Sequence, residues 1–311
     1  MRSLGNLVGF NGRFPPNKIS VNFYSTGHPV SKSKSIFSVN KKYYQKTPIT
    51  MVTAYDFFQG TIINGTNIDI VLVGDSLGMT TLGYQNTIPV TMDQMIHHSA
   101  AVTAGCKIPL IIGDMPFGSY ETDQTLAVSN AIRFMKEGKV NGVKLEGGIE
   151  ICEQINKIRR SGIPVMGHIG LTPQKLNALG GYRYQGKTVE DALKLLETAV
   201  ELERAGAFAI VLECITEEVA ELITKEITIP TIGIGSGKKT SGQVLVLHDI
   251  LGLFDGSPKF SKQYVNLAET IARILGQYEE EVTKRIFPEE EHTVKMDRYE
   301  SARLQSHMLP V

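Results

Sequence analysis

The stretch IVLVGD at residues 70–75 decides the fold, because the same pattern returns four more times along the chain. In each copy, a short apolar run ends in a side chain that can bind a proton or a metal ion. The five groups at the ends of these runs are Asp75, Asp114, Glu146, His168 and Glu213. Each run has the length and β-branched content of a buried parallel strand. Parallel strands all end on the same side of a sheet, so we expect the five groups to gather at one rim.

Eight strands of this kind alternate with stretches of helical pattern. The expected strands cover residues 48–54, 69–74, 109–113, 142–146, 163–168, 207–213, 231–234 and 244–249. This alternation indicates an α/β fold with a parallel sheet. The count of eight favours a (β/α)8 TIM barrel, whose chemistry lies at the carboxyl ends of the strands. It does not exclude an open doubly wound sheet, which requires no particular number of strands.

The composition limits the class of protein. The formal net charge is zero, so no excess of charge favours a nucleic acid or an anionic membrane as partner. The apolar runs are too short to cross a bilayer. The three cysteines, Cys106, Cys152 and Cys214, lack metal-ligand spacing and are expected to be reduced thiols. Cys214 follows Glu213, so strand alternation predicts that it packs against the helices.

The first part of the chain has the composition of a targeting segment. Residues 1–55 contain no Asp or Glu, and basic residues are spread among many Ser and Asn. This favours a mitochondrial transit peptide over residues 1–35, cut near residues 25–40, and hence a location in the matrix. A disordered tail without an address is the alternative. The (β/α)8 barrel is expected over residues 36–286, and a short, loose, polar C-terminal tail over 287–311.

Acidic groups at the strand ends predict a metal site. Asp75 and Asp114 would repel each other at neighbouring strand ends unless a positive charge lay between them. Oxygen ligands select Mg²⁺ or Mn²⁺, and Glu146 offers a third carboxylate. A salt bridge or a helix cap explains any one of these residues alone, but not the set. Lys144 could balance the carboxylates and also hold an anionic substrate, since these roles are compatible, and an electrostatic role is favoured over the alternative of a Schiff base.

Two other strand-end groups suggest proton chemistry. Glu213 ends an apolar strand and is a candidate general base, with a buried ion pair as the alternative. His168 fits a proton shuttle, a metal ligand or a hydrogen-bond donor, or else a structural histidine. The glycine-rich stretch at residues 233–237 lies where barrels often bind phosphate, but a tight turn is the better interpretation.

Six motifs resemble those of the ketopantoate hydroxymethyltransferase family. They lie in order, without a missing strand, between about Ser35 and Gly256. They are TAYD (53–56), VGDSLGM (73–79), GDMPF (113–117), VKLEGG (143–148), GHIGLTPQ (167–174) and LEC (212–214).

The resemblance implies an enzyme of pantothenate synthesis with small-molecule substrates. Its reaction joins a one-carbon unit from 5,10-methylenetetrahydrofolate to C3 of 3-methyl-2-oxobutanoate and gives 2-dehydropantoate. It implies Mg²⁺ at Asp75, Asp114 and Glu146, substrate contacts from Asp75, Ser76, Asp114 and Lys144, and Glu213 as the base. His168 would lie near the folate, and the family's decamers of two stacked five-membered rings imply a homo-oligomer.

Two alternatives remain open. One is a Mg²⁺-dependent 2-oxo acid lyase or mutase of the phosphoenolpyruvate mutase and isocitrate lyase type, which shares an acid-rich layout of strand ends. No cysteine lies in a loop that would serve such an enzyme as a nucleophile. The other is a barrel that kept the fold without catalysis, which predicts the loss of at least one strand-end acid, and none is lost.

Overall fold

The computed structural model describes residues 33–254 and 256–307. The predicted transit peptide, residues 1–35, therefore lies outside the described residues except for its last three.

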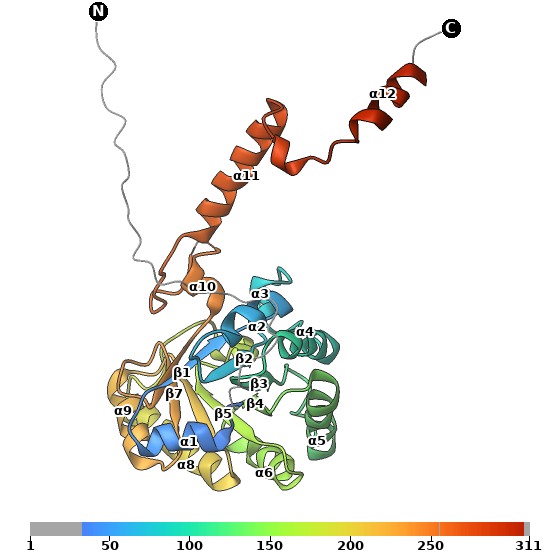
Figure 1. Cartoon of the computed structure of the whole chain (residues 1–311). Helices are drawn as coiled ribbons and strands as arrows, with labels where there is room; N and C mark the ends of the chain where they lie inside the picture. The colour runs from blue at the N-terminus through green and yellow to red at the C-terminus, as the bar shows by residue number, and fades with distance from the viewer. Residues whose placement is uncertain (1–32, 255, 308–311) are drawn as a thin grey trace, which may run out of the picture.

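Eight parallel strands close into a barrel in the order of the chain (Figure 1). The strands are β1 (Ile49–Thr53), β2 (Ile70–Val73), β3 (Leu110–Asp114), β4 (Gly142–Glu146), β5 (Val165–Gly170), β6 (Ala209–Glu213), β7 (Thr231–Ile234) and β8 (Gly242–Leu245). Strand β8 pairs with β1, which closes the sheet. The predicted (β/α)8 barrel is confirmed, and the open doubly wound alternative is wrong.

Helices surround the barrel, join its strands and continue beyond the last strand. The larger ones are α2 (Phe57–Asn64), α4 (Met92–Gly105), α5 (Gln124–Arg133), α6 (Cys152–Arg160), α8 (Val189–Ala205) and α9 (Glu217–Glu226). The short ones are α3 (Leu77–Thr80), η1 (Phe134–Gly138), η2 (Ile149–Ile151), η3 (Pro173–Lys175), α7 (Leu176–Leu179), α10 (Leu247–Leu251) and η4 (Glu290–His292).

The amino-terminal end of the barrel is covered by α1 (Ile36–Tyr44) (Figure 1). Val39 of this helix packs into the apolar cluster that fills the barrel. Lys34 and Lys42 pair with the buried Asp69 at 2.9 and 2.6 Å. Helix α1 therefore closes the amino-terminal end of the barrel, and the carboxyl ends of the strands lie on the opposite side.

Period-2 alternation along the strands separates two apolar layers. Outward-facing side chains such as Val71 and Ile111 pack against the surrounding helices, whereas the inward-facing Leu72 and Ile112 fill the barrel. The inward stripe continues to the strand ends, where its last members are polar. Thus Ile112 is followed on the same face by Asp114, and the same rule applies to β5 and β6.

Several predicted boundaries are wrong. The eighth strand was expected at residues 244–249 but covers Gly242–Leu245, and His248 belongs to α10. Gly242 lacks the Cβ atom that would lie 2.4 Å from the Ile49 carbonyl oxygen, so the chain meets β1 earlier than its apolar run suggests. Cys214 has a φ of 49°, which breaks the strand alternation and turns this residue to line the cavity at the rim.

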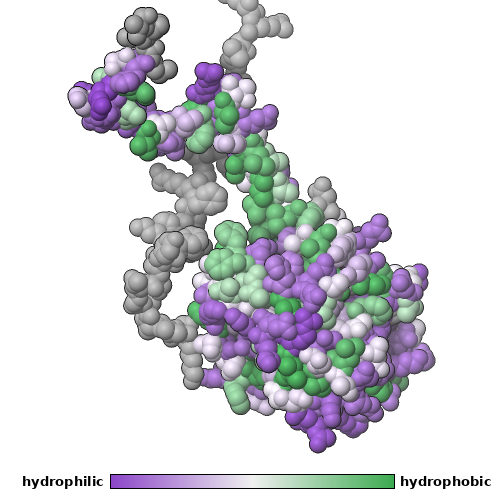
Figure 2. Space-filling model, turned by 90° about the vertical axis from the view of Figure 1, so that its right-hand side faces the viewer, coloured by the Kyte–Doolittle hydropathy of each residue, from purple (hydrophilic) through white to green (hydrophobic). Residues whose placement is uncertain are grey.

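The last helices leave the barrel. Helix α11 (Leu267–Thr283) projects outward, and none of its residues is buried (Figure 1). Apolar surface continues along this projecting segment in Figure 2. The expected polar tail contains α12 (Arg298–His307), which also buries no residue. Among the described residues, no helix is both long and apolar enough to cross a membrane.

Candidate active site

A cavity of about 540 Å³ opens at the carboxyl ends of the strands. All seven residues predicted for the site line it: Asp75, Ser76, Asp114, Lys144, Glu146, His168 and Glu213. Their positions follow from the topology, because the strands that carry them are neighbours in the barrel. The predicted convergence at one rim is therefore confirmed as geometry.

Three buried carboxylates form the centre of this site. Asp75, Asp114 and Glu146 each offer an oxygen atom, and these atoms lie within 4.8 Å of one another. Burial raises the pKa of Asp75 well above its usual range, and the charges of Asp114 and Glu146 raise it further. Burial also raises the pKa of Asp114, against the opposing charge of Lys144. A hard divalent cation would relieve this repulsion and suits three oxygen donors.

Lys144 is the ammonium group nearest to these carboxylates. Its Nζ lies 2.8 Å from Asp114 Oδ1 and 3.2 Å from Glu146 Oε1. Burial lowers the pKa of Lys144, but the charges of Asp114 and Glu146 outweigh it and raise the pKa above its usual value. The amine therefore stays protonated, which favours electrostatic balance or substrate binding over a Schiff-base role.

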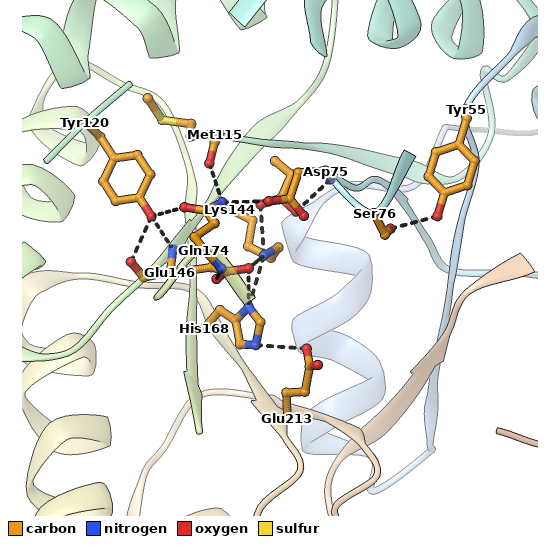
Figure 3. Close-up of polar contacts among 11 residues, drawn as sticks. Tyr55, Asp75, Ser76, Met115, Tyr120, Lys144, Glu146, His168, Gln174 and Glu213 are labelled. Atoms are coloured by element: carbon orange, nitrogen blue, oxygen red, sulfur yellow. Dashed lines mark hydrogen bonds and ion pairs between the residues drawn. The ribbon is translucent and has the colours of Figure 1, made fainter. Parts of the chain in front are cut away.

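His168 connects the carboxylate cluster to Glu213 (Figure 3). Its Nδ1 lies 3.2 Å from Glu146 Oε1, and its Nε2 lies 3.2 Å from Glu213 Oε2. Burial and the charge of Lys144 lower the pKa of His168, but the effects of Glu146 and Glu213 outweigh them and raise this pKa to about 9. In turn, Lys144 and His168 outweigh the effect of burial on Glu146 and lower its pKa to about 2.

Glu213 and Ser76 face the open part of the site. The Glu213 side chain is 16% exposed, whereas those of Glu146 and His168 are 1% and 3% exposed, so Glu213 is the carboxylate that a small molecule can reach. Ser76 Oγ lies 2.8 Å from the hydroxyl of Tyr55, which fixes it beside Asp75 (Figure 3).

The glycine-rich loop after β7 braces β6. The Ser236 hydroxyl donates to the Leu212 carbonyl at 2.8 Å and accepts from the Ile215 N–H at 3.0 Å, so it spans Glu213. At Gly235, a Cβ atom would lie 2.8 Å from the Phe260 ring. These contacts favour the tight-turn interpretation over a phosphate site.

Sequence reasoning did not single out Gln174 and Tyr120, which both contact the carboxylate cluster. Gln174 Nε2 donates to Asp75 Oδ2 at 2.9 Å, and Tyr120 accepts from the Glu146 N–H at 3.2 Å. Tyr120 and Gln174 lie in the segments that follow strands β3 and β5, and this position was the available signal.

Comparison with known proteins identifies the family. The sequence model described as ketopantoate hydroxymethyltransferase matches residues 33–290. The chain belongs to this family. It is 56% identical over 254 residues to a 3-methyl-2-oxobutanoate hydroxymethyltransferase of Thermotoga maritima, covering 81% of this chain and 94% of that protein. The corresponding Enterococcus faecalis protein is 52% identical over 249 residues, covering 80% of this chain and 90% of that protein.

The family assignment confirms the resemblance noted in the motifs and extends it to residue 290. The chain is therefore an enzyme, a hydroxymethyltransferase of the pantothenate pathway.

Solved structures with a similar barrel belong to other enzymes. Phosphonopyruvate hydrolase, solved with oxalate and Mg²⁺, has a TM-score of 0.58 at 12% identity, covering 88% of this chain and 99% of that chain. 2,3-Dimethylmalate lyase has a TM-score of 0.54 at 14% identity, covering 88% of this chain and 99% of that one. At these identities the likeness shows the fold alone.

The carboxylate cluster predicts a response to divalent cations. The pKa values of Asp75 and Asp114 are raised above 3.8 in the folded protein. The free energy of unfolding therefore falls as the pH rises from 3.8 through these raised values and the two carboxyl groups ionise. At pH 7, we expect Mg²⁺ at one hundred times its Kd to stabilise the protein by about 2.7 kcal/mol. Asp75→Asn should be at least as stable without metal and should lose most of this response, measured by thermal unfolding.

Asp93→Asn, whose native side chain is 84% exposed, is the control. An equal response in Asp75→Asn and the wild type would contradict the assignment.

Proposed function

We propose that this enzyme transfers a hydroxymethyl group from 5,10-methylenetetrahydrofolate to C3 of 3-methyl-2-oxobutanoate, in a Mg²⁺-assisted reaction. With one water consumed, the products are 2-dehydropantoate and tetrahydrofolate. One observation carries the proposal: three buried carboxylates adjoin a fourth, Glu213, that is open to the same cavity.

The 2-oxo acid end of the substrate fits the inner part of the cavity. Asp75, Asp114 and Glu146 would hold the cation, which when bound supplies the Lewis acidity that makes the neighbouring C–H bond acidic. Lys144 and Ser76 line the same cavity and would offer a charge and a hydroxyl to the carboxylate of the substrate. The buried positive charge of Lys144 favours an anionic ligand there.

Glu213 is the group placed to remove the C3 proton. It is the most exposed of the four carboxylates in the site. Among the described residues, His168 is the one basic side chain that forms an ion pair with it. A protonated His168, whose Nε2 lies 3.2 Å from Glu213 Oε2, would hold this carboxylate toward the cavity as an ion-pair partner. Because His168 is itself buried beneath Glu213, its position supports a role in handling the proton more than direct contact with the folate.

The outer part of the cavity suits a larger second substrate. Aromatic rings of Tyr182, Phe254 and Phe260 line it, together with the cations Arg183 and Lys259. Flat aromatic walls favour a planar ring system, and the cations favour an acidic tail. A reduced folate has both features. The volume of the cavity lies in the range of sites for drug-sized ligands, well above the needs of a five-carbon acid.

The lyase or mutase alternative keeps the cation but needs no folate. Its support is the structural likeness to enzymes such as 2,3-dimethylmalate lyase, which shows the fold alone. Dependence of turnover on 5,10-methylenetetrahydrofolate discriminates between the two functions.

We also propose that the enzyme forms a homo-oligomer, a decamer as the family resemblance implies. Five large apolar side chains of α11 are 42–60% exposed: Ile271, Ile274, Leu275, Tyr278 and Val282. Their spacing of three, one, three and four residues places them along one side of the helix. An exposed apolar row of this kind favours packing against another apolar surface. We propose that a second copy of the chain provides that surface.

Replacing Glu213 by Gln should abolish exchange of the C3 proton of 3-methyl-2-oxobutanoate with deuterated water. Affinity for the 2-oxo acid should stay within about tenfold, because a general base acts on the barrier more than on binding. NMR follows the exchange, and calorimetry follows binding. Exchange retained at the wild-type rate would exclude Glu213 as the base.

Replacing Leu275 by Lys should reduce the mass of the assembly, because it places a charge in the exposed apolar row of α11. Light scattering after size-exclusion chromatography measures the effect. Lys295→Leu, outside α11 and already exposed, serves as the control for a changed surface. Equal masses for Leu275→Lys and the wild type would contradict a role of α11 in assembly.

The proposed mitochondrial location makes a prediction about the mature amino terminus. In protein purified from its own cell, the first residue should fall within residues 25–40, as mass spectrometry of the amino-terminal peptide would show. A chain that still begins at Met1 or Arg2 would contradict the proposal.

A further inference from the structure

Gln174 occupies a central position that the proposed chemistry does not yet use. It lies in the short helix η3, which follows β5, and it is 2% exposed. It contacts groups at the carboxyl ends of three other strands, β2, β3 and β4 (Figure 3). No other residue in the described part of the chain donates side-chain hydrogen bonds to Asp75.

Gln174 contacts two of the three carboxylates through different groups. Its side-chain Nε2 donates to Asp75 Oδ2 at 2.9 Å, and its backbone N–H donates to Glu146 Oε2 at 3.2 Å. A carboxylate held at one oxygen by a fixed donor keeps the direction of its other oxygen. Both contacts are buried, so water does not compete for them.

The surroundings determine which way the amide points. Nε2 also donates to the Met115 carbonyl oxygen at 2.9 Å, and a flipped amide would place its oxygen against this acceptor and against Asp75. On the other side, the Tyr120 hydroxyl lies 2.6 Å from Gln174 Oε1 and donates to it. Burial raises the pKa of Tyr120 well above its usual value, so this hydroxyl keeps its proton.

We propose that Gln174 is a positioning residue that fixes Asp75 and Glu146 in the orientation a divalent cation requires, and that Tyr120 holds its amide in place. The inference rests on the proposed cation site. It adds a residue that touches neither substrate nor cation and acts through the ligands. Groups that orient metal ligands in this way typically contribute 10- to 100-fold in metal affinity.

The direct test is the affinity of the full chain for Mn²⁺ alone, measured by the loss of the free-ion EPR signal. Gln174→Met keeps the length of the side chain and the backbone N–H but removes the donor to Asp75. We expect its Kd for Mn²⁺ to rise by 10- to 100-fold. Gln154→Met is the matched control, because Gln154 is also a buried glutamine but lies on α6 outside the cavity. Its Kd should equal that of the wild type.

Tyr120→Phe provides a second variant with a milder change. It removes the hydrogen bond to the Gln174 amide together with the contacts of the hydroxyl with the Glu146 backbone. Mn²⁺ binding should weaken about two- to tenfold, and saturating Mg²⁺ should restore kcat while the Mg²⁺ requirement stays raised. A purely structural role would lower the unfolding temperature without moving the Mn²⁺ affinity of the folded protein.

The outcomes separate the inference from the proposed function. If the wild type binds no Mn²⁺, the cation site itself is wrong and the inference falls with it. If the wild type binds Mn²⁺ and either Gln174→Met or, should that variant not fold, Tyr120→Phe binds it as tightly, the positioning role is overturned while the proposed function stands.

Discussion

Repulsion among three buried carboxylates is the constraint on which the rim of this barrel depends. Asp75, Asp114 and Glu146 crowd their oxygens within 4.8 Å, away from water. Lys144 and His168 offset part of this charge, and they do so unequally. They lower the pKa of Glu146, whereas those of Asp75 and Asp114 stay raised. The protein thus keeps a site that is electrostatically incomplete, and the proposed divalent cation would complete it.

The barrel places these groups by a simple rule. Inward-facing residues alternate along each strand, and apolar ones fill the interior until the strand ends. The next inward position is then polar and faces the cavity, as Asp114 does after Ile112 and Glu213 does after Val211. This rule acts within a few residues of sequence. For that reason the barrel and the convergence of the strand-end groups could be predicted from the sequence, whereas Ser76 was indicated only by the family motif that contains it.

Features that depend on distant contacts could not be predicted in the same way. Gln174 meets Asp75 across 99 positions of sequence, and the local motif that contains it does not show which carboxylate it contacts. Cys214 was placed by strand alternation, but its left-handed backbone ends that alternation one residue after Glu213. The end of β8 was misjudged because pairing with β1, rather than the apolar run, sets its limits. Each case shows tertiary contacts overriding a local signal.

The account is tested most directly by EPR of bound Mn²⁺ in the presence of 3-methyl-2-oxobutanoate labelled with ¹⁷O at its keto and carboxylate oxygens. If the three carboxylates hold a cation that contacts the 2-oxo acid, Mn²⁺ should bind at one per chain and the label should broaden its lines. The unlabelled acid should leave them narrow. Identical lines with labelled and unlabelled acid, or Mn²⁺ that stays free in solution, would contradict the account.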